Sequence, residues 1–277
     1  YGALPETCGS FARYVEFETD AGRLIENYAT ALDDEMNNLY STETKHDLDL
    51  QINHYNTRWS VVQRIKQWEA FLVKLFGEFR KVGISSQFNI VKSSLVNYAR
   101  NLATCGFLAS TCDHMLFIDS DVEFEPEAVL SMLVVQKDIV CTPYRIKLED
   151  MKVRYAVDFP DKHNIEMLPG GIVEVEQGPA GLMVIHRRVF DKLMKVHPEM
   201  KIKFHLRGTG KLDEKYMYNF WDTTFNSETG LWKGEDLAFC DLARSVGFKI
   251  YANTGSKMIH HGTYGWEGKF GDTIKKN

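Results

Sequence analysis

The sequence predicts an α/β domain preceded by a helical region, and two patterns support this prediction. Between about residues 20 and 80, apolar residues recur at intervals of three and four, which is the spacing of amphipathic helices. After Gly83, short apolar runs of strand length alternate with helical segments, as in a sheet covered by helices. We therefore divide the chain into a helical N-terminal region, 1–82, and an α/β domain, 83–277.

Composition narrows the class of protein. The chain has 277 residues, of which 44% are hydrophobic, and 33 basic against 38 acidic side chains give a net charge of −5. This excludes a disordered or collagen-like chain and disfavours a nucleic-acid binder that works by bulk positive charge. The 5 cysteines contain no CxxC pair, no apolar run approaches the length of a membrane span, and the residues after Tyr1 lack the basic-then-apolar pattern of a leader. We expect a cytoplasmic protein without a transmembrane segment.

Two long helices are predicted in the N-terminal region, at about 20–40 and 59–80. The second carries a stripe of aromatic and aliphatic residues, including Trp59, Trp68 and Phe79. At helical spacing such a stripe is typical of a core or of a seam between subunits. A homo-oligomer formed through these helices is therefore one expectation.

Four helices and eight strands are predicted in the α/β domain. The expected helices cover about 93–109, 126–136, 187–196 and 235–246. The expected strands cover about 85–91, 115–118, 138–141, 152–157, 172–176, 181–185, 201–205 and 248–252. A loop rich in Gly, Asn and Thr is expected up to about residue 230.

The most informative segment is an apolar strand that ends in two carboxylates, His114-Met-Leu-Phe-Ile-Asp119-Ser-Asp121. Ligands of α/β sheets bind beyond the carboxyl ends of strands, so Asp119 and Asp121 are well placed for a site. Such a pair can hold Mg²⁺ or Mn²⁺, which in turn can bridge to the phosphates of a nucleotide. A solvated turn or a helix cap is the structural alternative.

The order of several motifs resembles GT-A glycosyltransferases, particularly family 2-like enzymes and related phage and viral proteins. The segment Ala99-Arg100-Asn101 precedes the Asp-x-Asp strand, and Pro126 follows it. The resemblance implies a Rossmann-like, mostly parallel sheet flanked by helices, with the N-terminal helices as an insertion. It implies that Asp119 and Asp121 bind the metal and the nucleoside diphosphate sugar, with Arg100 on the donor side. A surface cation is the alternative for Arg100.

Two later segments extend this resemblance. Gly178-Pro-Ala-Gly181 and the strand after it resemble the family's glycine-bearing turn, where Gly181 would allow close approach of a sugar; a simple tight turn is the alternative. Glu235-Asp236 opens a helix and resembles the family's acidic motif. Inverting sugar transfer needs a carboxylate that takes the acceptor proton, and we predict Asp236 for this role with Glu235 beside it. An acidic helix N-terminus is the alternative.

The last cluster contains two histidines, His260 and His261, followed by Gly262. By resemblance to the family, a histidine here completes the metal shell, with His260 the better match and His261 the fallback. Imidazole nitrogen suits Mn²⁺ better than Mg²⁺. Tyr264 and Trp266 follow and would flank a sugar, close a lid or pack in the core.

The sequence thus predicts a metal-dependent glycosyltransferase that moves a sugar from a nucleoside diphosphate sugar to a glycan or another hydroxyl acceptor. Both inverting and retaining chemistry are compatible with these residues. The long helical start departs from the family, and we expect that a first strand of the fold precedes Tyr1. An aspartyl-nucleophile phosphatase and a non-catalytic carbohydrate-binding or assembly protein on the same fold are the alternatives.

Overall fold

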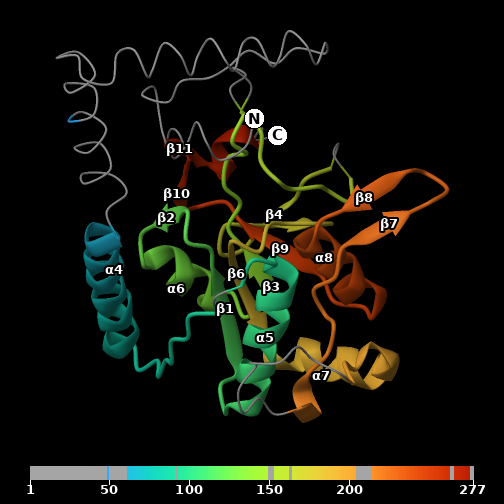
Figure 1. Ribbon diagram of the computed structural model, residues 1–277. Coiled ribbons are helices and arrows are strands. Elements are labelled where there is room, and N and C mark those ends of the chain that lie inside the picture. Colours follow the sequence, from blue (N-terminus) through green and yellow to red (C-terminus); the bar gives the residue numbers. More distant parts are fainter. Residues whose placement is uncertain are drawn as a thin grey trace, which may run out of the picture. The chain divides into compact units, whose positions relative to one another are not determined.

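The computed structural model describes Asp49 and residues 61–91, 93–148, 153–161, 164–203, 214–262 and 265–274 (Figure 1). The chain forms two compact units, Tyr1–Gly77 and Glu78–Asn277, and helix α4 (Val61–Lys81) runs across the boundary between them. This helix matches the one expected at 59–80. The helix expected at 20–40 lies outside the described residues. Among the described helices, none combines the length and the apolar character that crossing a membrane requires.

The second unit is built on a sheet with the strand order β1-β6-β3-β9-β5-β4. Its strands are β1 (His114–Ile118), β3 (Ile139–Cys141), β4 (Met167–Leu168), β5 (Ile172–Val175), β6 (Leu182–His186) and β9 (Ile250–Asn253). The helices of this unit are α5 (Val96–Ala109), α6 (Glu127–Val134), α7 (Arg187–Val196) and α8 (Glu235–Ser245). Its described residues also include three short 3₁₀ helices, η3 (Pro198–Met200), η4 (Glu214–Tyr216) and η5 (Phe270–Thr273).

The expectation of a mostly parallel sheet is wrong. Strands β1, β3 and β9 each follow a helix, and they all run in one direction, but only β3 and β9 are neighbours. Strand β6 runs the opposite way and lies between β1 and β3, and β5 runs antiparallel to β9. Both reversed strands follow loops instead of helices, and β5 pairs antiparallel with β4 across a short turn, as such connections favour. The fold class is therefore α/β with a mixed, mainly antiparallel sheet.

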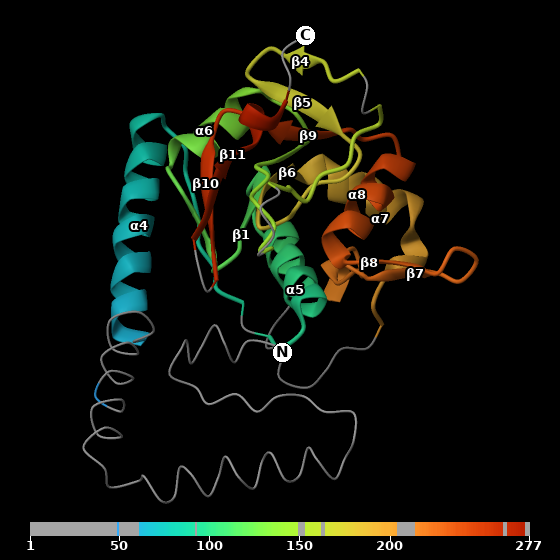
Figure 2. The same cartoon turned by 90° about the horizontal axis from the view of Figure 1, so that it is seen from above.

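Side-chain alternation divides this sheet into two buried faces. Two rows of aligned side chains cross one face of the sheet. The first row consists of Met115, Ile185, Ile139, Ile250 and Val175. The second row consists of Phe117, Met183, Cys141, Ala252 and Val173. These residues belong to the main core together with apolar side chains of α5, α7 and α8. Helix α6 contacts β6 and β9, and the views from two sides place it across the sheet from those three helices (Figures 1 and 2). The strands bury both faces because helices cover both.

Two smaller sheets were not predicted. One has the order β11-β10-β2 and consists of β2 (Val122–Phe124), β10 (Lys257–His261) and β11 (Gly265–Lys269). The other is the hairpin of β7 (Thr224–Asn226) and β8 (Leu231–Lys233), inside the expected loop. These strands are short, and their residues give little alternation from which to recognise them. The first of these sheets shapes the candidate site.

Three expected strands are corrected by the structure. No described residue between 84 and 95 lies in a strand, and Phe88 and Ile90 in this stretch are exposed. The described residues of 152–157 and 201–205 form only isolated bridges, such as Arg145 with Tyr155. Apolar residues in these segments therefore do not meet a sheet edge, which an assigned strand requires. The other expected helices and strands of this domain are confirmed to within three residues at each end.

Candidate active site

The Asp-x-Asp pair directly follows strand β1 and lies at the edge of the sheet where β1, β3 and β9 end. The backbone N–H of Asp119 donates to the carbonyl oxygen of Gly181 at 2.8 Å, just before β6 begins. Asp121 then leads into β2, which pairs with β10 so that Val122 lies opposite His260. This ladder brings the last predicted motif beside the first, although they are far apart in the chain.

Arg100 joins the first carboxylate motif to the second. Its Nη2 lies 3.1 Å from both carboxylate oxygens of Asp119, and its Nε lies 3.1 Å from Oε1 of Glu235. The guanidinium is buried, and its Cζ lies 5.1 Å from the ring centre of Phe117 and 5.7 Å from that of Trp221. Burial lowers the pKa of Arg100, but the charges of Asp119 and Glu235 outweigh this, and the pKa is raised. The structure thus places Arg100 inside the protein, against carboxylates.

Asp121 has different partners. Its Oδ2 lies 2.8 Å from Nζ of Lys147 and 3.3 Å from Nε2 of His260. Burial raises the pKa of Asp121, but the hydrogen bonds from the protonated form of His260 and from Lys147 outweigh it and hold the pKa well below its usual range. Asp121 is therefore a carboxylate at neutral pH, surrounded by groups that favour its charge.

His260 has the orientation of a metal-ligating histidine. Its Nδ1 lies 2.8 Å from the carbonyl oxygen of Arg145, and because a carbonyl oxygen only accepts, Nδ1 carries the proton. Nε2 faces Asp121: it donates to the carboxylate when the ring is protonated, and in the neutral ring its lone pair is the one that could bind a cation. The ring also lies 4.5 Å from that of Tyr144. His261 is directed elsewhere, with Nε2 2.7 Å from Oε2 of Glu123.

The donor set fits a divalent cation only in part. In the described portion of the chain, no three His, Cys, Asp or Glu side chains converge to hold a metal ion. Asp121 and His260 do converge, while both oxygens of Asp119 are bound by Arg100. Two protein ligands are enough for a cation whose other ligands are water and substrate phosphate oxygens, which is common for Mg²⁺.

The predicted base lies in the first turn of α8. Burial and the neighbouring charge of Glu235 raise the pKa of Asp236. Its Oδ1 accepts a hydrogen bond of 2.8 Å from the N–H of Leu237. Glu235 points instead to Arg100, so the two adjacent acids have different surroundings.

Sequence reasoning missed Tyr144 and Lys147. Tyr144 follows β3, and burial and the charges of Asp119 and Asp236 raise the pKa of its hydroxyl far above the usual value. A Cβ on Gly181 would overlap with the Tyr144 side chain, so this glycine permits close approach of a tyrosine. The end of a buried strand is a signal that could have identified Tyr144, whereas Lys147 lies in a polar loop without a motif.

Two other residues that the sequence placed near the site, Trp266 and Gly178, have packing roles in the structure. Trp266 is buried, and its indole N–H donates to the carbonyl oxygen of Leu148 at 3.1 Å, which favours the packing alternative over a lid. Tyr264 lies outside the described residues. A Cβ on Gly178 would overlap with the side chain of Cys141, so this glycine serves packing under the sheet.

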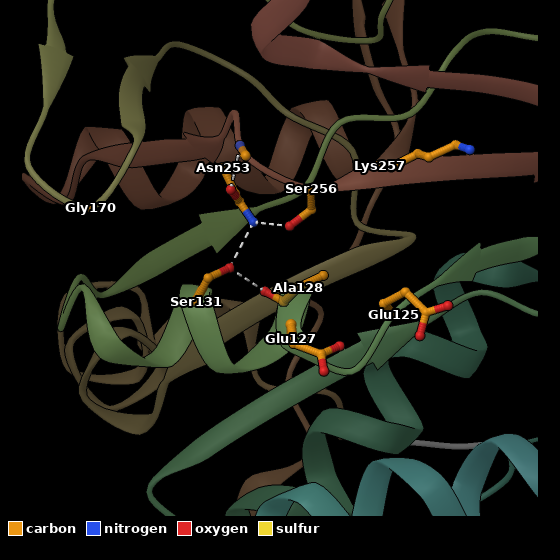
Figure 3. A pocket seen from close by; sticks show the side chains of 9 residues that line it. Glu125, Glu127, Ala128, Ser131, Gly170, Asn253, Ser256 and Lys257 are labelled. Carbon is orange, nitrogen blue, oxygen red and sulfur yellow. Dashed lines mark hydrogen bonds between the residues drawn. The ribbon is translucent and has the colours of Figure 1, made fainter.

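A separate pocket of about 360 Å³ lies beside α6 and contains none of the residues predicted for the site (Figure 3). Its centre is Asn253, whose amide donates to Ser131 at 3.0 Å and to Ser256 at 2.7 Å. These polar groups satisfy one another. We assign no ligand to this pocket.

Comparisons with known proteins add little. No protein-family model and no curated protein matches the chain. Among solved structures, the chain is similar to the A197 protein from STIV at 20% identity, with 68% of this chain and 78% of the other covered and a TM-score of 0.37. A likeness at this level carries no argument about fold or activity.

Proposed function

We propose that the protein is a metal-dependent GT-A-type glycosyltransferase that moves a sugar from a nucleoside diphosphate sugar to a hydroxyl acceptor. The observation that supports this proposal most is the bridge made by Arg100. One guanidinium binds both oxygens of Asp119 and, across 135 residues of sequence, Glu235. The two carboxylate motifs therefore belong to one site at one edge of the sheet.

Asp121 and His260 are the residues that would hold the cation. Their facing atoms, Oδ2 and Nε2, are a donor set that Mn²⁺ accepts, and the imidazole is fixed from behind by the Arg145 carbonyl. A bound cation would neutralise the charge that develops on the departing diphosphate. Asp119 supports this site indirectly, because its contact with Arg100 fixes the end of β1.

Asp236 is the proposed base. Its raised pKa makes its carboxylate a stronger proton acceptor than an ordinary aspartate. In an inverting reaction it takes the proton of the acceptor hydroxyl as that oxygen attacks the anomeric carbon. Glu235 then has a positioning role, since its carboxylate is bound to Arg100.

The alternatives are less well supported. A phosphatase of the aspartyl class would use Asp119 as nucleophile, but both oxygens of this residue bind a buried arginine. A non-catalytic carbohydrate-binding protein would not need a carboxylate whose pKa is raised beside the ligand site. Nucleotide binding without turnover would support that second alternative.

Donor binding can be tested by thermal unfolding with a panel of nucleoside diphosphates and their sugar conjugates, with and without Mn²⁺. At a ligand concentration 100 times Kd, one member of the panel should raise the unfolding midpoint by about 5–10 °C in the presence of Mn²⁺. Asp121→Asn should lose this shift. Glu199→Gln, an exposed carboxylate of η3, should keep it. A shift that is equal with and without Mn²⁺ would contradict the metal-dependent site.

A further inference from the structure

Each aspartate of the Asp-x-Asp pair is neutralised by a cation of the protein itself. Asp119 is bound by Arg100, and Asp121 is bound by Lys147. Arg100 is immobilised, because two carboxylates bind it and two aromatic rings cover it. This first pair is therefore a permanent part of the fold.

The second pair is built differently. The Lys147 side chain is 25% exposed and that of Asp121 is 43% exposed, compared with 6% for Arg100. Lysine carries its charge on a flexible chain and can change partners, whereas arginine binds in a fixed planar geometry. Ion pairs with this exposure contribute little to stability, so Lys147 can leave Asp121 at small cost.

Lys147 also faces the same atom that a cation would use. Its Nζ lies 2.8 Å from Oδ2 of Asp121, and Nε2 of His260 lies 3.3 Å from that same oxygen. A divalent cation held between Oδ2 and Nε2 would lie close to the ammonium. Two positive charges at that distance repel each other.

We propose that Lys147 is an exchangeable counter-ion: its ammonium neutralises Asp121 when no divalent cation is bound, and it moves to the diphosphate of the donor when a cation takes its place. This inference rests on the proposed function and identifies a further residue of the donor site. The exchange keeps the net charge of the site near zero both with and without the bound cation and diphosphate. It also makes cation and diphosphate bind more tightly together than separately.

The first test measures Mn²⁺ binding without nucleotide, by the loss of the electron paramagnetic resonance signal of free Mn²⁺. Lys147→Met removes the competing charge and should bind Mn²⁺ about two- to tenfold more tightly than the wild type. Lys147→Arg keeps the charge and should bind within about twofold of the wild type. Lys249→Met, which removes the exposed partner of Glu174 elsewhere in the unit, should also leave the affinity unchanged.

The second test repeats the titration with inorganic pyrophosphate as a probe of the diphosphate. Pyrophosphate should increase the Mn²⁺ affinity of the wild type, and this gain should be about tenfold smaller in Lys147→Met, because the ammonium is no longer there to bind phosphate oxygens. An equal gain in both proteins would overturn the transfer of Lys147 to the diphosphate.

The outcomes separate this inference from the proposed function. If Lys147→Met binds Mn²⁺ no more tightly than the wild type while Asp121→Asn loses binding, the metal site stands and the counter-ion inference is overturned. If neither the wild type nor Lys147→Met binds Mn²⁺, both fail. Circular dichroism spectra and unfolding midpoints of the variants confirm that each is folded.

Discussion

Asp121 and Asp236 show how one site gives two aspartates opposite properties. Hydrogen bonds from the protonated form of His260 and from Lys147 overcome the effect of burial and lower the pKa of Asp121. Burial and the charge of Glu235 raise the pKa of Asp236. Carboxylates whose pKa values are pushed apart in this way are suited to different tasks, a cation ligand in the first case and a base in the second.

The raised pKa of Asp236 predicts a stability cost at neutral pH. A group whose pKa is higher in the folded than in the unfolded chain stabilises the fold below the unfolded value, about 3.9, and loses this contribution as the pH rises through the folded value. Asparagine does not titrate and keeps the acceptor oxygen for the Leu237 N–H. Asp236→Asn should therefore raise the unfolding midpoint above that of the wild type, and by more at pH 8 than at pH 4.

Thermal denaturation of both proteins across this pH range measures the effect. The informative quantity is the difference between the two midpoints, since other titrating groups cancel in it. A difference that is the same at pH 4 and pH 8 would show that Asp236 has an ordinary pKa in the folded protein.

At the site, sequence reasoning is most specific where chemistry and motif order coincide. It predicts that Asp119, Asp121, Glu235 and His260 gather at one site, and the ion pairs of these residues lie at one edge of the sheet. It could not show that Arg100 is buried, because burial depends on rings from two other segments. It could not identify Lys147, because a lysine in a polar loop looks like any surface cation.

At the scale of elements, strand β6 organises the site. It lies between β1 and β3, so its first residues meet the ends of both neighbours. Gly181 precedes it, and the side chain of Tyr144, which follows β3, occupies the space where a Cβ would project. The glycine therefore allows the tyrosine to lie where the charges of Asp119 and Asp236 act on its hydroxyl.

This close approach predicts a specific pattern of stability changes. Gly181→Ala should lower the free energy of unfolding by about 1–3 kcal/mol, because the added methyl group overlaps with Tyr144. The same substitution should cost much less in a Tyr144→Ala background, where the ring is absent. Gly106→Ala is the matched control: it lies in α5 with open space around it, so it should stabilise the protein by about 0.5–1 kcal/mol.

Urea denaturation of the single and double variants measures these differences. Equal costs of Gly181→Ala with and without the Tyr144 ring would mean that the two residues do not interact.

Element prediction worked best where a periodic pattern is long. Helix α7 has the predicted bounds, and α5 and α8 lie within three residues of theirs. Strand direction was predicted wrongly, since periodicity contains no information on which strands become neighbours. The strand predicted at 85–91 was wrong for the same reason. The composition of this stretch suits a strand, but it pairs with no strand in the described part of the chain.

At the scale of the whole molecule, all residues proposed for catalysis belong to the unit Glu78–Asn277. The predicted boundary, between Val82 and Gly83, falls just beyond the end of α4, whereas the compact units meet within that helix. The second unit contains its own hydrophobic core. The proposed chemistry therefore depends on this unit for every side chain that we assign.

The central claim is sugar transfer with Asp236 as the base. It is tested most directly by measuring the release of nucleoside diphosphate from a nucleotide sugar, with Mn²⁺ present and water as the acceptor. The nucleotide sugar is the one that the thermal-shift panel identifies as the donor. The wild type should release it, and Asp236→Asn should bind the same donor yet release it at least about 100-fold more slowly. Glu127→Gln, a first-turn acid of α6, should behave like the wild type. Release by Asp236→Asn at the wild-type rate, or no release by the wild type from any donor, would contradict the account.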